Sequence, residues 1–237
     1  MVRLRLISVL TTMVLVLLMP TAVQAADPGS GWIYFNPHVP FTVTNGTETL
    51  LQGTKASDGS CRGGLTLRHE MGQPAVVAIE VGANPSTCQQ LIEVGSAPAP
   101  SGLSPMASGW RSGYFVTTWV DPLDLQLASV QDSMTWTYDG TYVDSVSSYS
   151  ETLNEDQFTG WYVQSDSGAV LSWAPHQYSA TVYSNVTFQN YKFCGGTTIH
   201  FQPNSFTAYG APRDAGYVDT WATGCDTNLI YYYSYLW

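Results

Sequence analysis

Basic residues are scarce in this chain. Its 237 residues include 8 Lys and Arg against 18 Asp and Glu, which gives a formal net charge of −10 at pH 7. Arg3 and Arg5 fall within the first 25 residues, and without them the balance is 6 against 18, or −12. Nucleic acids and anionic membrane surfaces are bound through clustered Lys and Arg. The scarcity of positive charge therefore excludes both from the expected partners.

Long apolar runs are confined to the N-terminus. Arg3 and Arg5 precede an apolar run of 13 residues, Ile7–Met19, and small residues before Ala26 form a cleavage site. A membrane-spanning helix needs roughly 20 apolar residues, so this pattern is typical of a cleaved signal peptide. We expect residues 1–25 to be removed and the mature chain to be secreted to the extracellular space. We expect no membrane span in the mature chain.

Cysteine is rare, and its spacing is not that of a zinc site. The four cysteines form no CxxC motif, whereas structural zinc sites use closely spaced cysteine pairs. In an exported protein disulfides are the default, and four cysteines allow three connectivities. We favour Cys61–Cys88 and Cys194–Cys225, because each pair lies within one part of the chain. The sequence predicts no metal and no cofactor.

Common catalytic motifs are missing as well. The chain has neither the GxSxG motif of serine hydrolases nor an SxxK motif. His69-Glu70 begins an HExxH pattern, but Gln73 stands where the second zinc-binding His is required. The other histidines are scattered along the chain: His38, His176 and His200. The question of enzymatic activity stays open, and these absences favour a protein without catalysis.

Alternating aromatic and β-branched residues dominate what the chain does contain. Tyr114–Val120 and Tyr178–Phe188 alternate in this way, which is typical of half-buried strands. Asp139-Gly140 and Asn45-Gly46 lie between such runs and predict two tight hairpins. Within residues 113–143 no helical apolar period extends beyond about two turns. The sequence therefore predicts an all-β fold, an antiparallel β-sandwich stapled by disulfides.

A stretch rich in Pro, Ser and Ala, residues 96–109, divides the chain. Its three prolines favour an extended connector, either a linker between two packed β sections or a long surface loop. We place an N-terminal β section at 26–95 and a C-terminal β-sandwich section at 110–237. Within the second section, Ser145–Gln157 is rich in Ser and acid, and we expect it to form a polar loop.

The C-terminal section carries a resemblance. The stretches GYFVTTWVDPLDL and WTYDG, followed by paired cysteines near the end of the chain, resemble those of a loose group of secreted bacterial β-rich proteins of unknown function. The resemblance covers residues 109–237. It implies export and a β fold, and it brings no activity and no site residues.

Aromatic residues are in excess, at 13% of the chain. Flat rings can stack on sugar faces, and Tyr and Trp add polar tips for hydrogen bonds. Neighbouring strand residues point to opposite faces, so Tyr231, Tyr232 and Tyr233 cannot all face a core. We therefore predict a module that binds carbohydrate or a cell-surface polymer through exposed rings. Its candidate ligand-binding residues are Trp161, Tyr162, Trp173 and Trp221.

Two alternative functions stay open. A pair of carboxylates across a cleft can hydrolyse glycosidic bonds, and the stretch 151–166 contains four acids close to Trp161 and Trp173: Glu151, Glu155, Asp156 and Asp166. A secreted polysaccharide hydrolase that uses these acids is the first alternative. The second is a structural, envelope-associated protein without a small ligand.

Two further places offer possible calcium ligands. Asp121 and Asp124, and the run Asn154–Asp156, offer oxygen ligands of the kind that Ca²⁺ prefers. Neither has the spacing of an EF-hand loop. We interpret these aspartates as turn caps.

Overall fold

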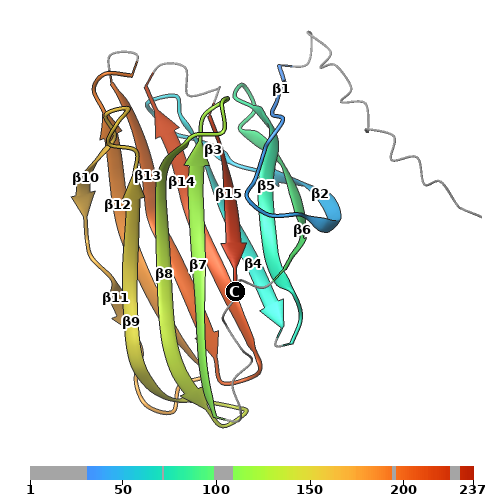
Figure 1. The fold of residues 1–237 in the computed structure, drawn as a ribbon, viewed down its shortest axis with the longest axis vertical. Helices are drawn as coiled ribbons and strands as arrows, with labels where there is room; N and C mark the ends of the chain where they lie inside the picture. The colour runs from blue at the N-terminus through green and yellow to red at the C-terminus, as the bar shows by residue number, and fades with distance from the viewer. Residues whose placement is uncertain (1–30, 71, 99–108, 194–195, 225–229) are drawn as a thin grey trace, which may run out of the picture.

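The computed structural model describes residues 31–70, 72–98, 109–193, 196–224 and 230–237. Within these ranges the chain forms strands and no helix, and the strands make two antiparallel sheets that pack face to face (Figure 1). The prediction of an all-β antiparallel sandwich is confirmed. The predicted signal peptide lies outside the described residues. None of the described residues form a helix that could cross a membrane.

The first sheet has eight strands in the order β2-β6-β5-β15-β7-β8-β9, with β1 paired to β5. Four of them come from the N-terminal part of the chain: β1 (Ile33–Tyr34), β2 (Thr44–Gln52), β5 (Ala75–Asn84) and β6 (Gln89–Ala97). The other four are β7 (Trp110–Val120), β8 (Gln126–Tyr138), β9 (Val143–Glu155) and β15 (Tyr231–Leu236). The last strand of the chain therefore lies in the middle of this sheet.

The second sheet has seven strands in the order β10-β12-β13-β14-β4-β3, with β11 paired to β12. Its members are β3 (Thr54–Lys55), β4 (Cys61–Glu70), β10 (Tyr162–Asp166), β11 (Val170–Ser172), β12 (Ser179–Asn190), β13 (Thr197–Tyr209) and β14 (Arg213–Thr223). β9 in the first sheet and β10 in the second lie on the same edge of the sandwich (Figure 1).

The two parts of the chain on either side of residues 96–109 are interleaved in both sheets. β15 pairs with β5 on one side and with β7 on the other, and β14 pairs with β4. A single large core takes Leu65 and Ile92 from the first part and Phe115 and Val182 from the second. Residues 99–108 of the predicted connector lie outside the described residues.

Large apolar side chains from alternate strand positions fill the space between the sheets. The largest that are fully buried include Trp136, Tyr232, Phe115, Phe188, Phe201 and Phe206. Full burial of one such side chain stabilises the fold by roughly 1.5–3 kcal/mol. Gly216 on β14 makes room for the Phe115 ring, because a Cβ atom at this position would collide with that ring.

A disulfide joins the two sheets. Cys61 begins β4 of the second sheet, and Cys88 lies in the turn between β5 and β6 of the first, with 5.1 Å between their Cα atoms. This predicted pair is confirmed. The predicted pair Cys194–Cys225 lies outside the described residues.

Local predictions had mixed outcomes. Asp139-Gly140 does form a hairpin, between β8 and β9. Asn45-Gly46 does not: Asn45 adopts a positive φ of 55° within β2, where one extra residue makes a bulge against β6. The same tolerance of positive φ that suits a turn is used here for a bulge. The predicted loop Ser145–Gln157 is also wrong, because most of it forms the edge strand β9.

Candidate functional site

Two of the four predicted ligand-binding rings are buried. Trp161 is 2% exposed and belongs to the central core. Trp221 is 7% exposed, because Arg62 from β4 covers it at 3.5 Å and the His200 ring from β13 stacks on it at 4.6 Å. The prediction that these two rings are exposed is wrong. An alternating sequence pattern shows which residues share one face of a strand, but it does not show which other side chains cover that face.

Tyr162 and Trp173 are half-buried along the β10–β11 edge of the second sheet. The Tyr162 hydroxyl donates to Oε1 of Gln189 at 2.9 Å, and its ring lies 5.6 Å from that of Tyr191. Trp173 follows β11 and packs against the central core. The four predicted rings are thus not gathered into one exposed surface.

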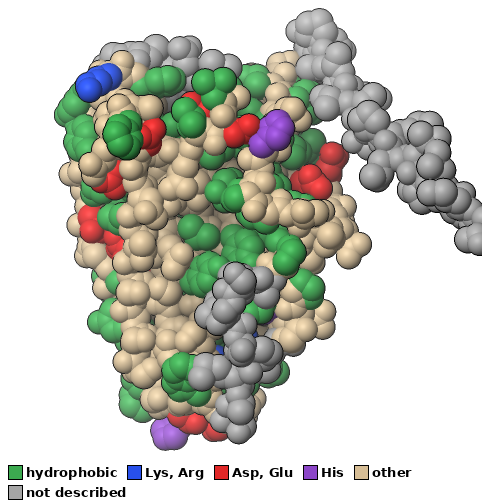
Figure 2. Space-filling view, in the orientation of Figure 1, with side chains coloured by type: hydrophobic (Ala, Val, Ile, Leu, Met, Phe, Trp, Pro, Cys, Tyr) green, Lys and Arg blue, Asp and Glu red, His purple; other side chains and the backbone are tan. Residues whose placement is uncertain are grey.

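A different set of rings lines a groove on the outer face of the first sheet, across β15, β7 and β8. We call it the aromatic groove. Its volume is about 640 Å³, within the range of small-molecule sites. Figure 2 shows hydrophobic side chains gathered at the centre of this face, with the charged side chains toward its rim. The rings in the groove are Phe41, Tyr114, Tyr233 and Tyr235.

These rings are held together by strand pairing. β7 and β15 are neighbours, so outward-facing residues of the two strands lie side by side. Tyr114 and Tyr235 stack with ring centroids 5.9 Å apart, and Phe41 packs edge-on against Tyr233 at 5.6 Å. The Tyr235 hydroxyl donates to the carbonyl oxygen of Pro98 at 2.9 Å, which fixes that ring. Tyr235 is buried, whereas Tyr114 and Tyr233 are half-buried and present ring surface to the groove.

Uncharged polar groups form the rest of the groove. They are Thr118, Gln126, Ser129, Gln131 and Asn154. Among the residues that the structure describes, the side-chain amides of Gln131 and Asn154 have no hydrogen-bond partner. No Asp, Glu, Lys or Arg is among the described residues that line it. A ligand here meets ring faces, free amide donors and acceptors, and no charge.

The sequence held part of the signal for this groove. The three consecutive tyrosines of β15 had to point both ways, and in the structure Tyr232 is buried in the core while Tyr233 faces the groove. Sequence reasoning missed Tyr114 as its neighbour, because nothing local indicates that β15 pairs with β7.

Three carboxyl groups converge where β9 faces β10, and we call them the carboxyl cluster. Asp132 on β8 is paired directly with Glu151 on β9, and Asp166 ends β10 in the opposite sheet. Asp132 is fully buried and accepts hydrogen bonds from Ser184 Oγ at 3.0 Å and from Asn204 Nδ2 at 2.7 Å. The sequence singled out Glu151 and Asp166 but missed Asp132. Its position between Val130 and Met134, on an inward-facing row, was the available signal.

Burial changes the acidity of two of these groups. It raises the pKa of Asp132 to about 7, against the opposing effect of the hydrogen bonds from Asn204 and Ser184. Burial also raises the pKa of Glu151 to about 7, and the charge of Asp166 and a hydrogen bond to it act in the same direction. At neutral pH, Glu151 is therefore protonated in a large fraction of molecules. A protonated carboxyl beside a second carboxyl is the arrangement that acid–base chemistry requires.

The other two acids of the predicted hydrolase site lie apart from this cluster in their contacts. Glu155 accepts a hydrogen bond from Nε2 of Gln157 at 2.8 Å. Asp156 caps a turn, accepting from the Phe158 amide at 3.1 Å and from the Thr159 hydroxyl at 2.9 Å. Neither hydrogen-bonds to Glu151 or Asp166.

The aspartates considered for calcium also act within turns and loops. Asp121 accepts from the backbone amides of Leu123 and Leu125 at 2.8 and 2.9 Å. Asp124 accepts from the Tyr231 hydroxyl and lies 2.9 Å from His38. Within the part of the chain that the structure describes, no group of three or more His, Cys, Asp or Glu side chains is placed to hold a metal ion.

Comparison of the chain with protein families, with curated proteins and with solved structures finds no match. The likeness of residues 109–237 to secreted bacterial β-rich proteins therefore stays a prediction. The aromatic groove and the carboxyl cluster are the features that bear on its function.

Proposed function

We propose that this is an exported protein that binds an uncharged polysaccharide chain in the aromatic groove. The observation that carries the proposal is the combination of half-buried tyrosine rings with unpaired amides in one open groove whose described lining residues carry no charge. Export is supported by the N-terminal pattern of residues 1–25 and by the Cys61–Cys88 disulfide.

Each part of the groove matches one part of a sugar. The apolar face of a pyranose stacks on an aromatic ring, and its equatorial hydroxyls need donors and acceptors in the ring plane. Tyr114 and Tyr233 supply the aromatic rings, and Gln131 and Asn154 supply the hydrogen-bond donors and acceptors. An acidic polysaccharide would gain no ion pair here, and the net charge of the protein, −10, would repel it. The proposal therefore specifies neutral glycans such as cellulose or chitin.

Removal of the Tyr114 ring is expected to weaken binding to insoluble cellulose or chitin by about 5- to 30-fold. Stacking and burial of one ring contribute about 1–2 kcal/mol, and about 1.4 kcal/mol is a factor of ten in affinity. The measurement is depletion of the protein from solution by the polymer, with Tyr114→Ala compared with wild type. Gln131→Ala is expected to weaken binding several-fold, because a buried sugar hydroxyl loses its partner.

Two matched variants control for nonspecific effects. Tyr114→Phe keeps the ring and is expected to bind nearly as wild type. Tyr217→Ala removes a ring that is 38% exposed on the second sheet, and it is expected to bind unchanged. Equal binding by Tyr114→Ala and wild type would remove the groove as the site. Absence of binding to any neutral glycan would favour the structural, envelope-associated alternative.

The carboxyl cluster favours hydrolysis of a polysaccharide as a second candidate function. Glu151, with its pKa of about 7, would protonate the leaving oxygen, and Asp166 would act as the partner carboxylate once the substrate has separated the two groups, which hydrogen-bond to each other in the free protein. Asp132 lies too deep to touch a polymer, and its charge, when it is ionised, raises the pKa of Glu151.

Glu151→Gln is expected to abolish release of reducing sugar from any polysaccharide that the protein cleaves, with a loss of at least about 100-fold. General acid catalysis contributes about 10²–10⁴-fold, and an amide cannot donate a proton in this way. Glu155→Gln is the matched control and is expected to retain activity. If wild type releases no sugar from polymers to which it binds, this second function is removed and binding alone remains.

A further inference from the structure

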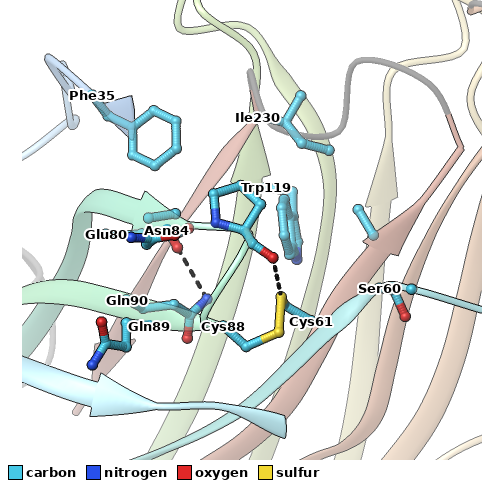
Figure 3. A pocket seen from close by; sticks show the side chains of 14 residues that line it. Phe35, Ser60, Cys61, Glu80, Asn84, Cys88, Gln89, Gln90, Trp119 and Ile230 are labelled. Atoms are coloured by element: carbon cyan, nitrogen blue, oxygen red, sulfur yellow. Dashed lines mark hydrogen bonds between the residues drawn. A yellow bond between two sulfur atoms is a disulfide. The ribbon is translucent and has the colours of Figure 1, made fainter. Parts of the chain in front are cut away.

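A second, smaller cavity lies at the end of the sandwich that carries the disulfide, and we call it the Glu80 cavity. Its volume is about 120 Å³, and it is partly open to solvent. Figure 3 shows Phe35 and Ile230 above the cavity, Glu80 and Trp119 on its two sides, and the disulfide below. Strands of the first sheet and the loop before β4 both contribute to its wall.

Glu80 is an unusual wall residue, because it is an acid with only 3% of its surface exposed. The pairing of β5 with β6 slips by one residue between Glu80 and Gly82. Such bulges re-aim a side chain and are common next to functional sites. The Glu80 carboxyl accepts a hydrogen bond from Nε2 of Gln90 at 3.0 Å and another from the backbone N–H of Tyr232. Neither partner carries a positive charge.

Burial of this unpaired acid raises its pKa to about 8, and the two hydrogen bonds offset only part of the shift. At pH 6 to 7 Glu80 is therefore a neutral acid with a proton to donate. Gln90 and the Tyr232 amide both donate to Glu80 in this arrangement, so neither of them accepts that proton. A buried donor without an acceptor costs free energy unless a ligand or water completes the hydrogen bond.

We propose that the Glu80 cavity binds a small uncharged carbonyl compound, with its carbonyl oxygen accepting the hydrogen bond from Glu80 and its flat apolar part lying against Trp119 and Phe35. A dry cavity of about 150 Å³ takes up benzene. The Glu80 cavity is smaller, at about 120 Å³, but its mouth is open, so one six-membered ring can enter it with an edge left in solvent. The site is separate from the aromatic groove, whose lining residues are different. It stands whether or not a polysaccharide binds there.

Among the groups packed around Glu80, Glu80 itself is the one that changes its protonation state between pH 6 and pH 9.5. Tyr232 faces it from β15, and burial holds the pKa of that hydroxyl well above its usual value. Asp219 of β14 acts on Tyr232, and neither Asp219 nor Arg62 of β4 contributes to the shift at Glu80. Gln90 from β6 and Trp119 from β7 carry no charge.

The test uses two probes of nearly the same shape, benzamide and the benzamidinium cation, titrated into the oxidised mature protein and followed by ligand-observed NMR. Benzamide offers a neutral acceptor, and benzamidinium offers only donors and a positive charge. We expect wild type to bind benzamide at pH 6 and to lose at least tenfold in affinity at pH 9.5, where Glu80 is ionised. Benzamidinium is expected to show the opposite dependence, with tighter binding at pH 9.5.

Two variants locate the effect. Glu80→Gln keeps the shape and an N–H donor, so it is expected to bind benzamide equally at both pH values and to lose the pH preference of benzamidinium. Ala222→Leu fills the cavity from its wall and is expected to bind neither probe, with a native circular dichroism spectrum as the check on its fold. The proposal is overturned if wild type binds neither probe at either pH, if Glu80→Gln keeps the pH dependence, or if Ala222→Leu binds both probes as wild type does.

Discussion

The protein is expected to be several kcal/mol less stable at pH 9 than at pH 5, and the double variant Glu80→Gln, Asp132→Asn is expected to lose a large part of that difference, with Glu151 and His69 contributing the rest. Burial raises the pKa of Glu80 to about 8 and that of Asp132 to about 7. In the unfolded chain both groups titrate near pH 4. Between about pH 4 and pH 8 the folded protein therefore holds more protons than the unfolded chain, so stability falls as the pH rises.

The size of the effect follows from the same shifts. One pKa unit corresponds to about 1.4 kcal/mol. Ionisation of each of the two buried acids therefore lowers the free energy of unfolding by on the order of 3–5 kcal/mol at most. His69 adds to the trend. Burial alone would lower its pKa, but the hydrogen bond and the charge of Asp214 outweigh burial and raise it. The stabilisation from protonated His69 is complete below pH 6.5 and is lost as the pH rises through its folded-state pKa.

Three carboxyl groups near the surface stabilise the fold when ionised, and this contribution is lost only in strong acid. The pKa values of Asp58, Asp124 and Asp139 are lowered, chiefly by hydrogen bonds that each carboxylate accepts. Their stabilisation is present above their usual pKa of 3.8 and is lost as the pH falls through the lowered values. Greatest stability is therefore expected in mild acid.

Urea unfolding at pH 5, 7 and 9 measures this dependence for wild type and the double variant. Asp144→Asn is the matched control, since Asp144 is exposed on β9, and it is expected to keep the wild-type slope. A wild-type free energy of unfolding that stays level or rises from pH 5 to pH 9 would contradict the assignment of buried neutral acids.

Loss of the disulfide in the double variant Cys61→Ser, Cys88→Ser is expected to cost about 3.5 kcal/mol of stability. The two cysteines are 27 residues apart, and the chain-entropy model gives about this value for a closed loop of that length. The bond also ties the start of β4 in one sheet to the β5–β6 turn in the other. Its removal therefore frees a connection between the two layers as well as a loop.

The control for this prediction is the same pair of proteins under reducing conditions. In reductant, wild type also lacks the Cys61–Cys88 bond, so the two free energies of unfolding should converge, and any effect on other cysteines is common to both. A difference of about 3.5 kcal/mol that persisted in reductant would assign the loss to the serine side chains instead.

The sequence predicted those elements that local patterns define. Tyr114–Val120 and Tyr178–Phe188 alternate because one face of each strand meets the core, and both lie in strands of the sandwich. β9 was wrongly predicted to be a loop. It is an edge strand whose outer positions carry Ser, Thr and Asn, and a polar sequence of this kind is also typical of loops. The hairpin predicted at Asn45-Gly46 is wrong because a residue with positive φ, here Asn45, can form a bulge as well as a turn.

The candidate sites were harder to predict, because they depend on which strands meet. Trp161 and Trp221 are of a residue type that is common in binding sites, and only the tertiary packing shows that other side chains bury them. Tyr114 and Tyr235 come together through the pairing of β7 with β15, more than a hundred residues apart in the chain. Glu151 and Asp166 were within reach of sequence reasoning, whereas the contact of Asp132 with Ser184 and Asn204 spans both sheets.

The place of β15 in the first sheet bears on when this protein can fold. β5 and β7 are both complete some 110 residues before Tyr231–Leu236 leaves the ribosome, yet in the sheet they are joined only through this strand. The two halves of the first sheet therefore keep unpaired edges at β5 and β7 until β15 has been made. Completion of this sheet waits for β15, which inserts between two strands that are already present.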